Sequence, residues 1–119
     1  EAMFEAALAQ GNDILMLATF APAVPSMEAE FHQLAAAQGS KATLRTQVVA
    51  GARDALSAGD VERHNRLVVE AARQNPHVDA IVLAHFSMEV AFEEIKAAAA
   101  CLVLSSAQAA VAKLKRLMA

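Results

Sequence analysis

Four short strand-like runs, separated by longer segments with helical periodicity, constrain the fold of this 119-residue chain more than any other feature. Residues 13–20 (DILMLATF) and 78–84 (VDAIVLA) are continuous apolar runs, which are typical of strands buried on both faces of a parallel sheet. Residues 43–49 (TLRTQVV) alternate between apolar and polar side chains, which predicts an edge strand with one wetter face. Residues 101–104 (CLVL) predict a last, short buried strand.

Helical segments lie between these runs, and capping residues mark several of their first turns. We predict helices at residues 1–10, 26–38, 50–58, 60–74, 86–99 and from 105 or 106 to 117. Pro22 and Pro25 end the first strand because they lack the amide donors of a ladder. Ser26, Asp60 and Ser87 are expected N-caps. Strands that alternate with helices imply right-handed crossovers, so we expect an α/β three-layer sandwich, flavodoxin-like, with a roughly four-stranded parallel sheet.

Composition and charge exclude several classes of function. The chain is 56% hydrophobic and 19% charged, which suits one globular domain over residues 1–119. Its formal net charge is -3, its basic residues are scattered and its aromatic fraction is 4%, so a nucleic-acid partner is not expected. No apolar run reaches the ~20 residues that a membrane-spanning helix needs, so no membrane partner is expected either.

The single cysteine, Cys101, cannot form an internal disulfide, which favours a reducing, cytoplasmic location. We interpret it as a small core residue at the start of a buried strand. No metal-ligand spacing is present, so no metal is expected. The first residues, EAMFEAALAQG, resemble the middle of a helix, so we expect a fragment of a longer protein. Apolar surface left by the missing part could drive homo-oligomerisation.

The carboxyl ends of parallel strands share one edge of a sheet, and ligands bind there where helix N-termini converge. Residues 19–26, 85–87 and 105–106 are expected along this edge. The first two segments repeat one pattern, L-A-x-F followed by S-M-E, which we interpret as a strand end leading into a helix start. Their hydroxyls and free amides suit a carboxylate or a phosphate.

Each candidate also has a purely structural interpretation. The serines can act as N-caps alone, Thr19 can bond locally, and His85 can pack where the most apolar strand ends. Asp13 and Asp79 precede strands at the opposite edge, so we exclude them from the chemistry. The remaining histidines are interpreted as surface residues: His32, His64 and His77.

Three stretches together resemble the aspartate/glutamate/hydantoin racemase superfamily: ILMLATFAPAVPSMEAEF, VDAIVLAHFSM and CLVLSSAQAAVAKLKRL. The resemblance covers nearly the whole chain but would correspond to the second, C-terminal half of a racemase-like protein. It implies two similar α/β lobes with a site between them, no metal and no other cofactor. In this family two cysteines exchange the proton on the carbon α to a carboxylate, and hydroxyls and amides hold that carboxylate.

Carried over by position, Thr19 and Ser26 would lie in the substrate-carboxylate loop. His85 would replace the catalytic cysteine of the pattern D-x-x-x-L-G-C-T as an acid or base, and Phe86 and Ser87 would flank it as substrate-binding residues. The chain departs from the family where Ala84 replaces the glycine of this pattern, where Pro22 replaces a threonine, and in the spacing of Ser26. Two-cysteine racemisation by this chain alone is therefore not expected.

The resemblance implies a cofactor-independent amino-acid racemase-like protein that acts on a small carboxylic or amino acid, together with a missing N-terminal lobe. The alternatives are a related decarboxylase or isomerase, or a non-catalytic module that binds small carboxylates or regulates. A purely structural lobe or a receiver domain is a third class. A receiver would need an acidic pocket at the carboxyl edge, and the sequence shows none there.

Overall fold

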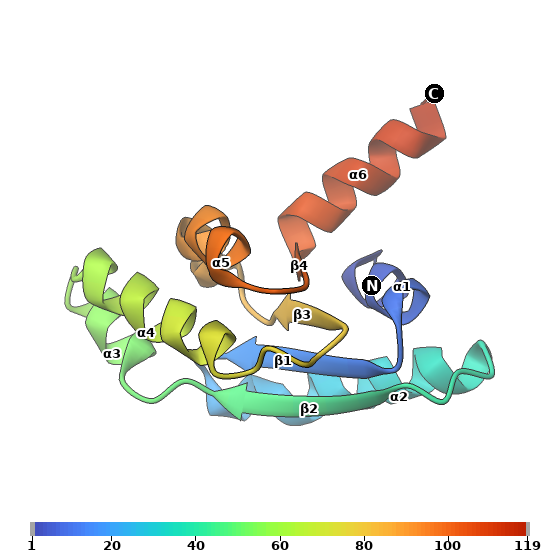
Figure 1. Ribbon diagram of the computed structural model, residues 1–119, viewed down its shortest axis with the longest axis horizontal. Coiled ribbons are helices and arrows are strands. Elements are labelled where there is room, and N and C mark those ends of the chain that lie inside the picture. Colours follow the sequence, from blue (N-terminus) through green and yellow to red (C-terminus); the bar gives the residue numbers. More distant parts are fainter. Residues whose placement is uncertain (1, 119) are drawn as a thin grey trace.

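The four strand-like runs form one parallel sheet between two layers of helices (Figure 1). A computed structural model describes residues 2–118. The strand order is β2-β1-β3-β4, and every neighbouring pair is parallel. This is the order of the first four strands in flavodoxin-like sheets. The strands of the described chain are β1 (Asp13–Ala18), β2 (Thr43–Val48), β3 (Ala80–Leu83) and β4 (Leu102–Ser105).

Helices cover both faces of the sheet, as the alternating pattern predicts. Elements α1, α2 and α6 pack on one face, and α3, α4, η2 and α5 pack on the other. The predicted helix at 1–10 is confirmed from Ala2, and Glu1 lies outside the described residues. The helical elements are α1 (Ala2–Gln10), η1 (Ala21–Ala23), α2 (Val24–Ala37), α3 (Ala52–Ser57), α4 (Val61–Arg73), η2 (Phe86–Ala91), α5 (Phe92–Ala98) and α6 (Ser106–Met118).

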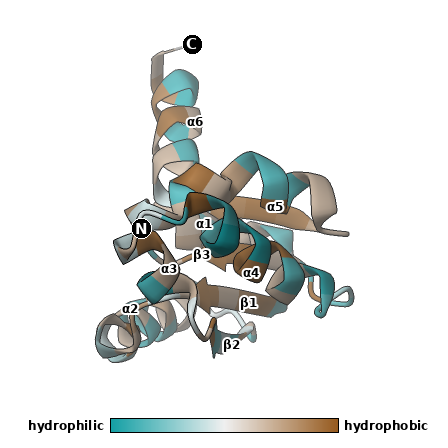
Figure 2. Ribbon diagram, turned by 90° about the vertical axis from the view of Figure 1, so that its left-hand side faces the viewer, coloured by the Kyte–Doolittle hydropathy of each residue, from teal (hydrophilic) through white to brown (hydrophobic). Residues whose placement is uncertain are grey.

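The two central strands explain the continuous apolar runs. In β1, Leu15 and Leu17 face the layer of α4 and α5, whereas Ile14 and Met16 face the layer of α1 and α2. All four side chains are buried, because each face of the strand is covered by helices. Figure 2 shows β1 as a largely brown, hydrophobic strand in the middle of the molecule. β2 lies at one edge, as its alternating pattern predicts.

The predicted N-cap at Ser26 is wrong, because α2 begins two residues earlier. Pro25 occupies the first turn of α2, where a missing N–H costs nothing, and η1 with Pro22 leads into it. The Ser26 hydroxyl therefore donates back to the carbonyl of Ala23 over 3.3 Å instead of accepting an amide hydrogen. The first strand also ends early, at Ala18 rather than at residue 20.

Other predicted helix starts are partly confirmed. Asp60 caps α4 by accepting the Arg63 amide at 3.0 Å, and Ser105 caps α6 by accepting the Gln108 amide at 3.2 Å. The helix predicted at 50–58 begins later because Gly51 has a φ of +80°, which an α-helix cannot continue through. The element after β3 starts as the 3-10 helix η2, and its first turn has no side-chain cap, so the prediction that Ser87 caps it is wrong.

His64 is fully buried, which corrects its interpretation as a surface residue. It lies in the first turns of α4, on the face that packs against the neighbouring helices. The buried face of α4 is wider than its aliphatic residues alone would predict, because it also includes His64 and Asn65. Its Nδ1 contacts the Asn65 Oδ1 at 2.8 Å, and the Asn65 amide reaches the carbonyl of Val90 and the carboxylate of Glu94. Its Nε2 has no partner among the described residues.

The amino edge of the sheet is fixed by one carboxylate. Asp79 Oδ2 accepts the amides of Asn12 and Asp13, each over 2.9 Å, just before β1 and β3 begin. Gly11 leaves room for this carboxylate, because a Cβ placed there would lie 2.5 Å from the Asp79 Cγ. Asp79 is therefore a structural residue at the edge opposite the predicted site.

The C-terminal helix α6 leads away from the sheet (Figure 1). Ala109 is its buried residue, and Lys113 forms a 2.9 Å ion pair with Glu5 of α1. On the outer side of α6, apolar side chains such as Val111 and Leu114 are more than half exposed. In the described part of the chain, no helix has the length and apolar character that crossing a bilayer requires.

Candidate functional site

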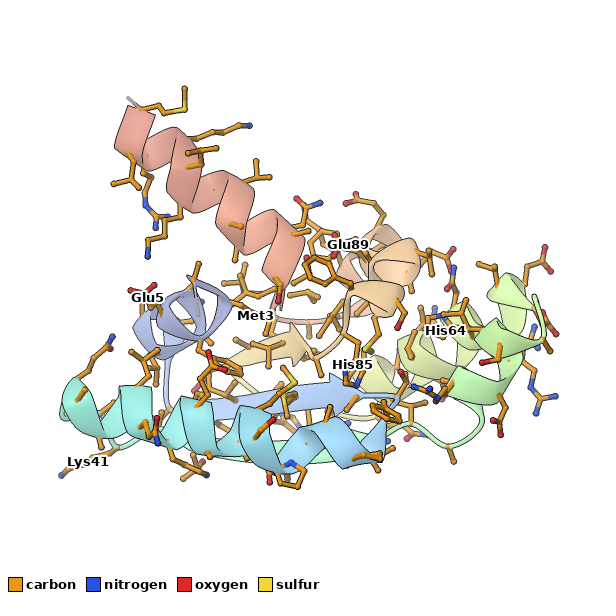
Figure 3. All side chains as sticks on the ribbon, turned by 180° about the vertical axis from the view of Figure 1, so that it is seen from behind. Met3, Glu5, Lys41, His64, His85 and Glu89 are labelled. Atoms are coloured by element: carbon orange, nitrogen blue, oxygen red, sulfur yellow. The ribbon has the colours of Figure 1, made fainter. Side chains whose placement is uncertain are left out.

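The carboxyl ends of β1 and β3 are the point where the chain diverges. After β1 the chain turns to α2 on one face, and after β3 it turns to η2 and α5 on the other. Such a switch between neighbouring parallel strands leaves a crevice outside the strand ends, which is where ligands bind in open α/β sheets. The fold therefore makes the edge between Thr19 and His85 the candidate site. Figure 3 shows His85 at the end of the sheet toward which the arrows of β1 and β3 point.

A cleft of about 330 Å³ opens at this point. Its walls come from three segments that follow β1, β2 and β3, and its described lining contains one cation and no carboxylate. The lining residues are Thr19, Phe20, Arg53, Leu56, Ser57, His85 and Ser87.

The structure brings together three of the five residues that the sequence singled out. Thr19, His85 and Ser87 line the cleft. Ser26 is exposed in the first turn of α2 and is not part of the lining. Phe86 precedes Ser87 in η2, but its ring is 75% exposed and does not line the cleft either.

His85 is held by the strand end beside it. The backbone N–H of Phe20 donates to the His85 Nε2 over 3.2 Å, which explains why β1 ends before Phe20: its amide bonds to the imidazole and not to the ladder. Burial, and then the positive charge of Arg53, lower the pKa of His85 below its usual 6.5. The imidazole is therefore neutral at pH 7, and its hydrogen lies on Nδ1 because Nε2 is the acceptor.

The cation of the cleft is held by an aromatic ring. The Arg53 Cζ lies 4.0 Å from the centroid of the Phe20 ring, a cation–π geometry. The same ring meets the His85 imidazole at an interplanar angle of 68°, with 6.5 Å between the centroids. The ring of Phe20 is thus a neighbour of both the cation and the imidazole of the cleft.

The sequence reasoning missed Arg53 and Ser57, although the sequence contained a signal for them. β2 is parallel to β1, so the segment after β2 must start at the same carboxyl edge as the segments after β1 and β3. Only three of the four strand ends were considered as sources of site residues. The helix after the edge strand supplies the charged residue of the cleft.

The donor groups of this arrangement are chemically suited to an anion. A guanidinium, an imidazole N–H and the hydroxyls of Thr19, Ser57 and Ser87 surround one small volume. Among residues 2–118, no three His, Cys, Asp or Glu side chains are close enough to hold a metal ion. Comparisons with protein-family models, with curated proteins and with solved structures gave no match.

Proposed function

We propose that the cleft binds the carboxylate of a small carboxylic or amino acid, and that the chain is a lobe of a cofactor-independent, racemase-like protein. In such a protein the proton on the carbon α to the carboxylate is exchanged. The observation that carries the proposal is the position of Arg53 and His85 in one cleft at the switch point between β1 and β3. A cytoplasmic location fits the lone cysteine.

Arg53 supplies the attraction for the anion. A guanidinium presents a planar set of N–H donors that matches the two oxygens of a carboxylate. No carboxylate lies in the described lining to compete for it, so the positive charge is available to a ligand. A cleft of about 330 Å³ is at the small end of ligand sites, which favours small acids over larger ligands.

His85 suits the role of a hydrogen-bond donor in its present tautomer. When a proton leaves the carbon α to a carboxylate, negative charge develops on the carboxylate oxygens, and a neutral imidazole N–H can stabilise it. For His85 to accept a proton at Nε2, the bond from the Phe20 amide must first break. The resemblance to racemases implies that a residue of the second lobe removes the α proton.

The second candidate is the non-catalytic module, which binds small carboxylates without chemistry. The occupied Nε2 of His85 favours it, because a group that already accepts a hydrogen bond is a poorer base. Both candidates share carboxylate binding at the same cleft. They differ in whether hydrogen at the α carbon exchanges with solvent.

The binding test is a titration of the chain with malonate, followed by NMR shifts and calorimetry. Malonamide, which is similar in size but uncharged, is the matched ligand control. We expect saturable shifts at Thr19, Arg53 and His85 with malonate, and none with malonamide. Arg53→Gln should weaken binding, whereas Arg66→Gln, at an exposed position of α4 outside the cleft, should leave it unchanged. Equal binding of malonate by wild type and Arg53→Gln would refute the proposal.

Hydrogen exchange at the α carbon, if the chain catalyses it, supports the catalytic candidate over the binding module. The chain is incubated in D₂O with malonate or with α-amino acids, and entry of deuterium at the α carbon is measured. Exchange that His85→Ala abolishes and His85→Gln retains supports a donor role, since glutamine keeps an N–H. Loss in both variants supports an acid–base role. Saturable binding without exchange supports the binding module or a lobe that needs its second half.

A further inference from the structure

We propose that Phe20 is the positioning residue of this cleft, with its backbone amide fixing the His85 imidazole and its ring holding the Arg53 guanidinium. The inference rests on the proposed function, because it explains how the two groups that would meet a carboxylate are held in place. The repeated L-A-x-F pattern places Phe20 at this edge of the sheet but gives it no role in binding.

Packing alone does not account for the Phe20 side chain. The ring is 36% exposed, and it belongs to neither of the two hydrophobic clusters that cover the faces of the sheet. Its ring contacts are instead the Arg53 guanidinium at 4.0 Å and the His85 imidazole. The ring of Phe20 therefore lies at the rim of the cleft, in contact with the cation and facing the imidazole, and outside the core packing of either face of the sheet.

The backbone of Phe20 sets the hydrogen position on His85. Its N–H donates to Nε2, so the neutral imidazole must carry its hydrogen on Nδ1. Within residues 2–118, the side-chain hydrogen bond seen at His85 is the one at Nε2, so the N–H on Nδ1 is the one available to a ligand. The other tautomer, which carries its hydrogen on Nε2, would place that N–H against the Phe20 N–H.

The ring of Phe20 reduces the cost of ordering Arg53. A free arginine side chain loses substantial rotamer entropy when it binds an anion. A guanidinium that already lies over an aromatic ring has lost part of that freedom before the ligand arrives. Phe20 therefore prearranges the cation and the N–H donor around the same volume.

The test compares Phe20→Leu, which keeps an apolar side chain but removes the aromatic face, with Phe20→Trp, which keeps that face. We expect Phe20→Leu to weaken malonate binding about threefold, the size of an exposed cation–π contact. Phe20→Trp should restore binding to at least the wild-type level. The pKa of His85 should rise in Phe20→Leu, because Arg53 is no longer held beside it, and should stay low in Phe20→Trp.

The tautomer is read in the ligand-free protein from the ¹⁵N shifts of His85 and from scalar coupling between its Nε2 and the Phe20 amide. A hydrogen on Nε2 would overturn the inference. So would unchanged malonate affinity and an unchanged His85 pKa in Phe20→Leu while wild type binds malonate. If wild type binds no malonate, the proposed function fails, whereas the tautomer and the pKa comparison still decide the role of Phe20.

Discussion

Replacing Gly11 with alanine should destabilise the fold through a single carboxylate at the amino edge of the sheet. The added Cβ would lie 2.5 Å from both Cγ and Oδ2 of Asp79 and 2.7 Å from its Cβ. The carboxylate must move, and it then loses the amides of Asn12 and Asp13, each bonded over 2.9 Å. Gly11 is not in the left-handed region, so alanine suits its backbone and the cost is steric.

The magnitude follows from the two lost bonds. A hydrogen bond to a charged group contributes about 1.5 kcal/mol at the low end, and partial exposure reduces this value, so the pair is worth about 2 kcal/mol. The substitution also reduces the entropy of the unfolded chain, which offsets about 0.5 kcal/mol. Displacement of the backbone around Asp79 adds to the loss. We expect Gly11→Ala to lower the free energy of unfolding by about 2 kcal/mol, which corresponds to about 8 °C in Tm.

The assay is urea unfolding followed by far-UV circular dichroism, because the chain has no Trp or Tyr for fluorescence. Asp79→Gly provides the matched background, since it removes all three atoms that the new Cβ would meet. In that background Gly11→Ala should be neutral or slightly stabilising. An equal loss in both backgrounds, or a gain in the wild-type background, would refute the reasoning.

Three further predictions concern the cleft, its histidine and the core. Arg53→Gln should weaken malonate binding about tenfold or more in calorimetry, because a charge-assisted contact is lost; a smaller effect would mean that Arg53 does not meet the anion. The pKa of His85 is lowered in the folded state, so its neutral form stabilises the fold above pH 6.5, and this stabilisation is lost as the pH falls below 6.5. We therefore expect the urea midpoint to drop less between pH 7.5 and pH 5.5 in His85→Gln than in wild type. Phe31→Ala should cost about 3–5 kcal/mol, because Phe31 is fully buried and packs edge-on against Phe4 at 5.5 Å, whereas truncation of exposed His32 should cost little; similar urea midpoints for both variants would contradict this packing.

The architecture could be predicted because it depends on patterns that few other folds produce. The continuous apolar runs of β1 and β3 and the alternation in β2 are direct consequences of burial on two faces or on one. Asp60 and Ser105 could be placed as caps because capping depends on the nearest turn alone. The failures at Ser26 and Ser87 have the same origin, since the hydroxyl type was right but the first turn lay elsewhere.

The site could be predicted only in part, because its decisive contacts join segments far apart in sequence. Thr19 and His85 follow from the rule that ligands bind at strand ends, and they do line the cleft. The bond from the Phe20 amide to His85 spans 65 residues, and no local pattern signals it. The burial of His64 depends on tertiary packing around α4, which a helical period with polar neighbours does not reveal.

The cleft is bounded partly by the two central strands of the sheet and partly by the short helix α3. The strands behind Thr19 and His85 are the two central ones, each hydrogen-bonded on both sides. Arg53 lies instead on the six-residue helix α3, which stands between Gly51 and Gly59, both at φ near +80°. Within this segment Ala52 and Ala55 are buried against the core, whereas Arg53 is exposed to the cleft. The charge of the cleft can therefore be changed at position 53 while the buried alanines of the same helix, and the register of every strand, stay as they are.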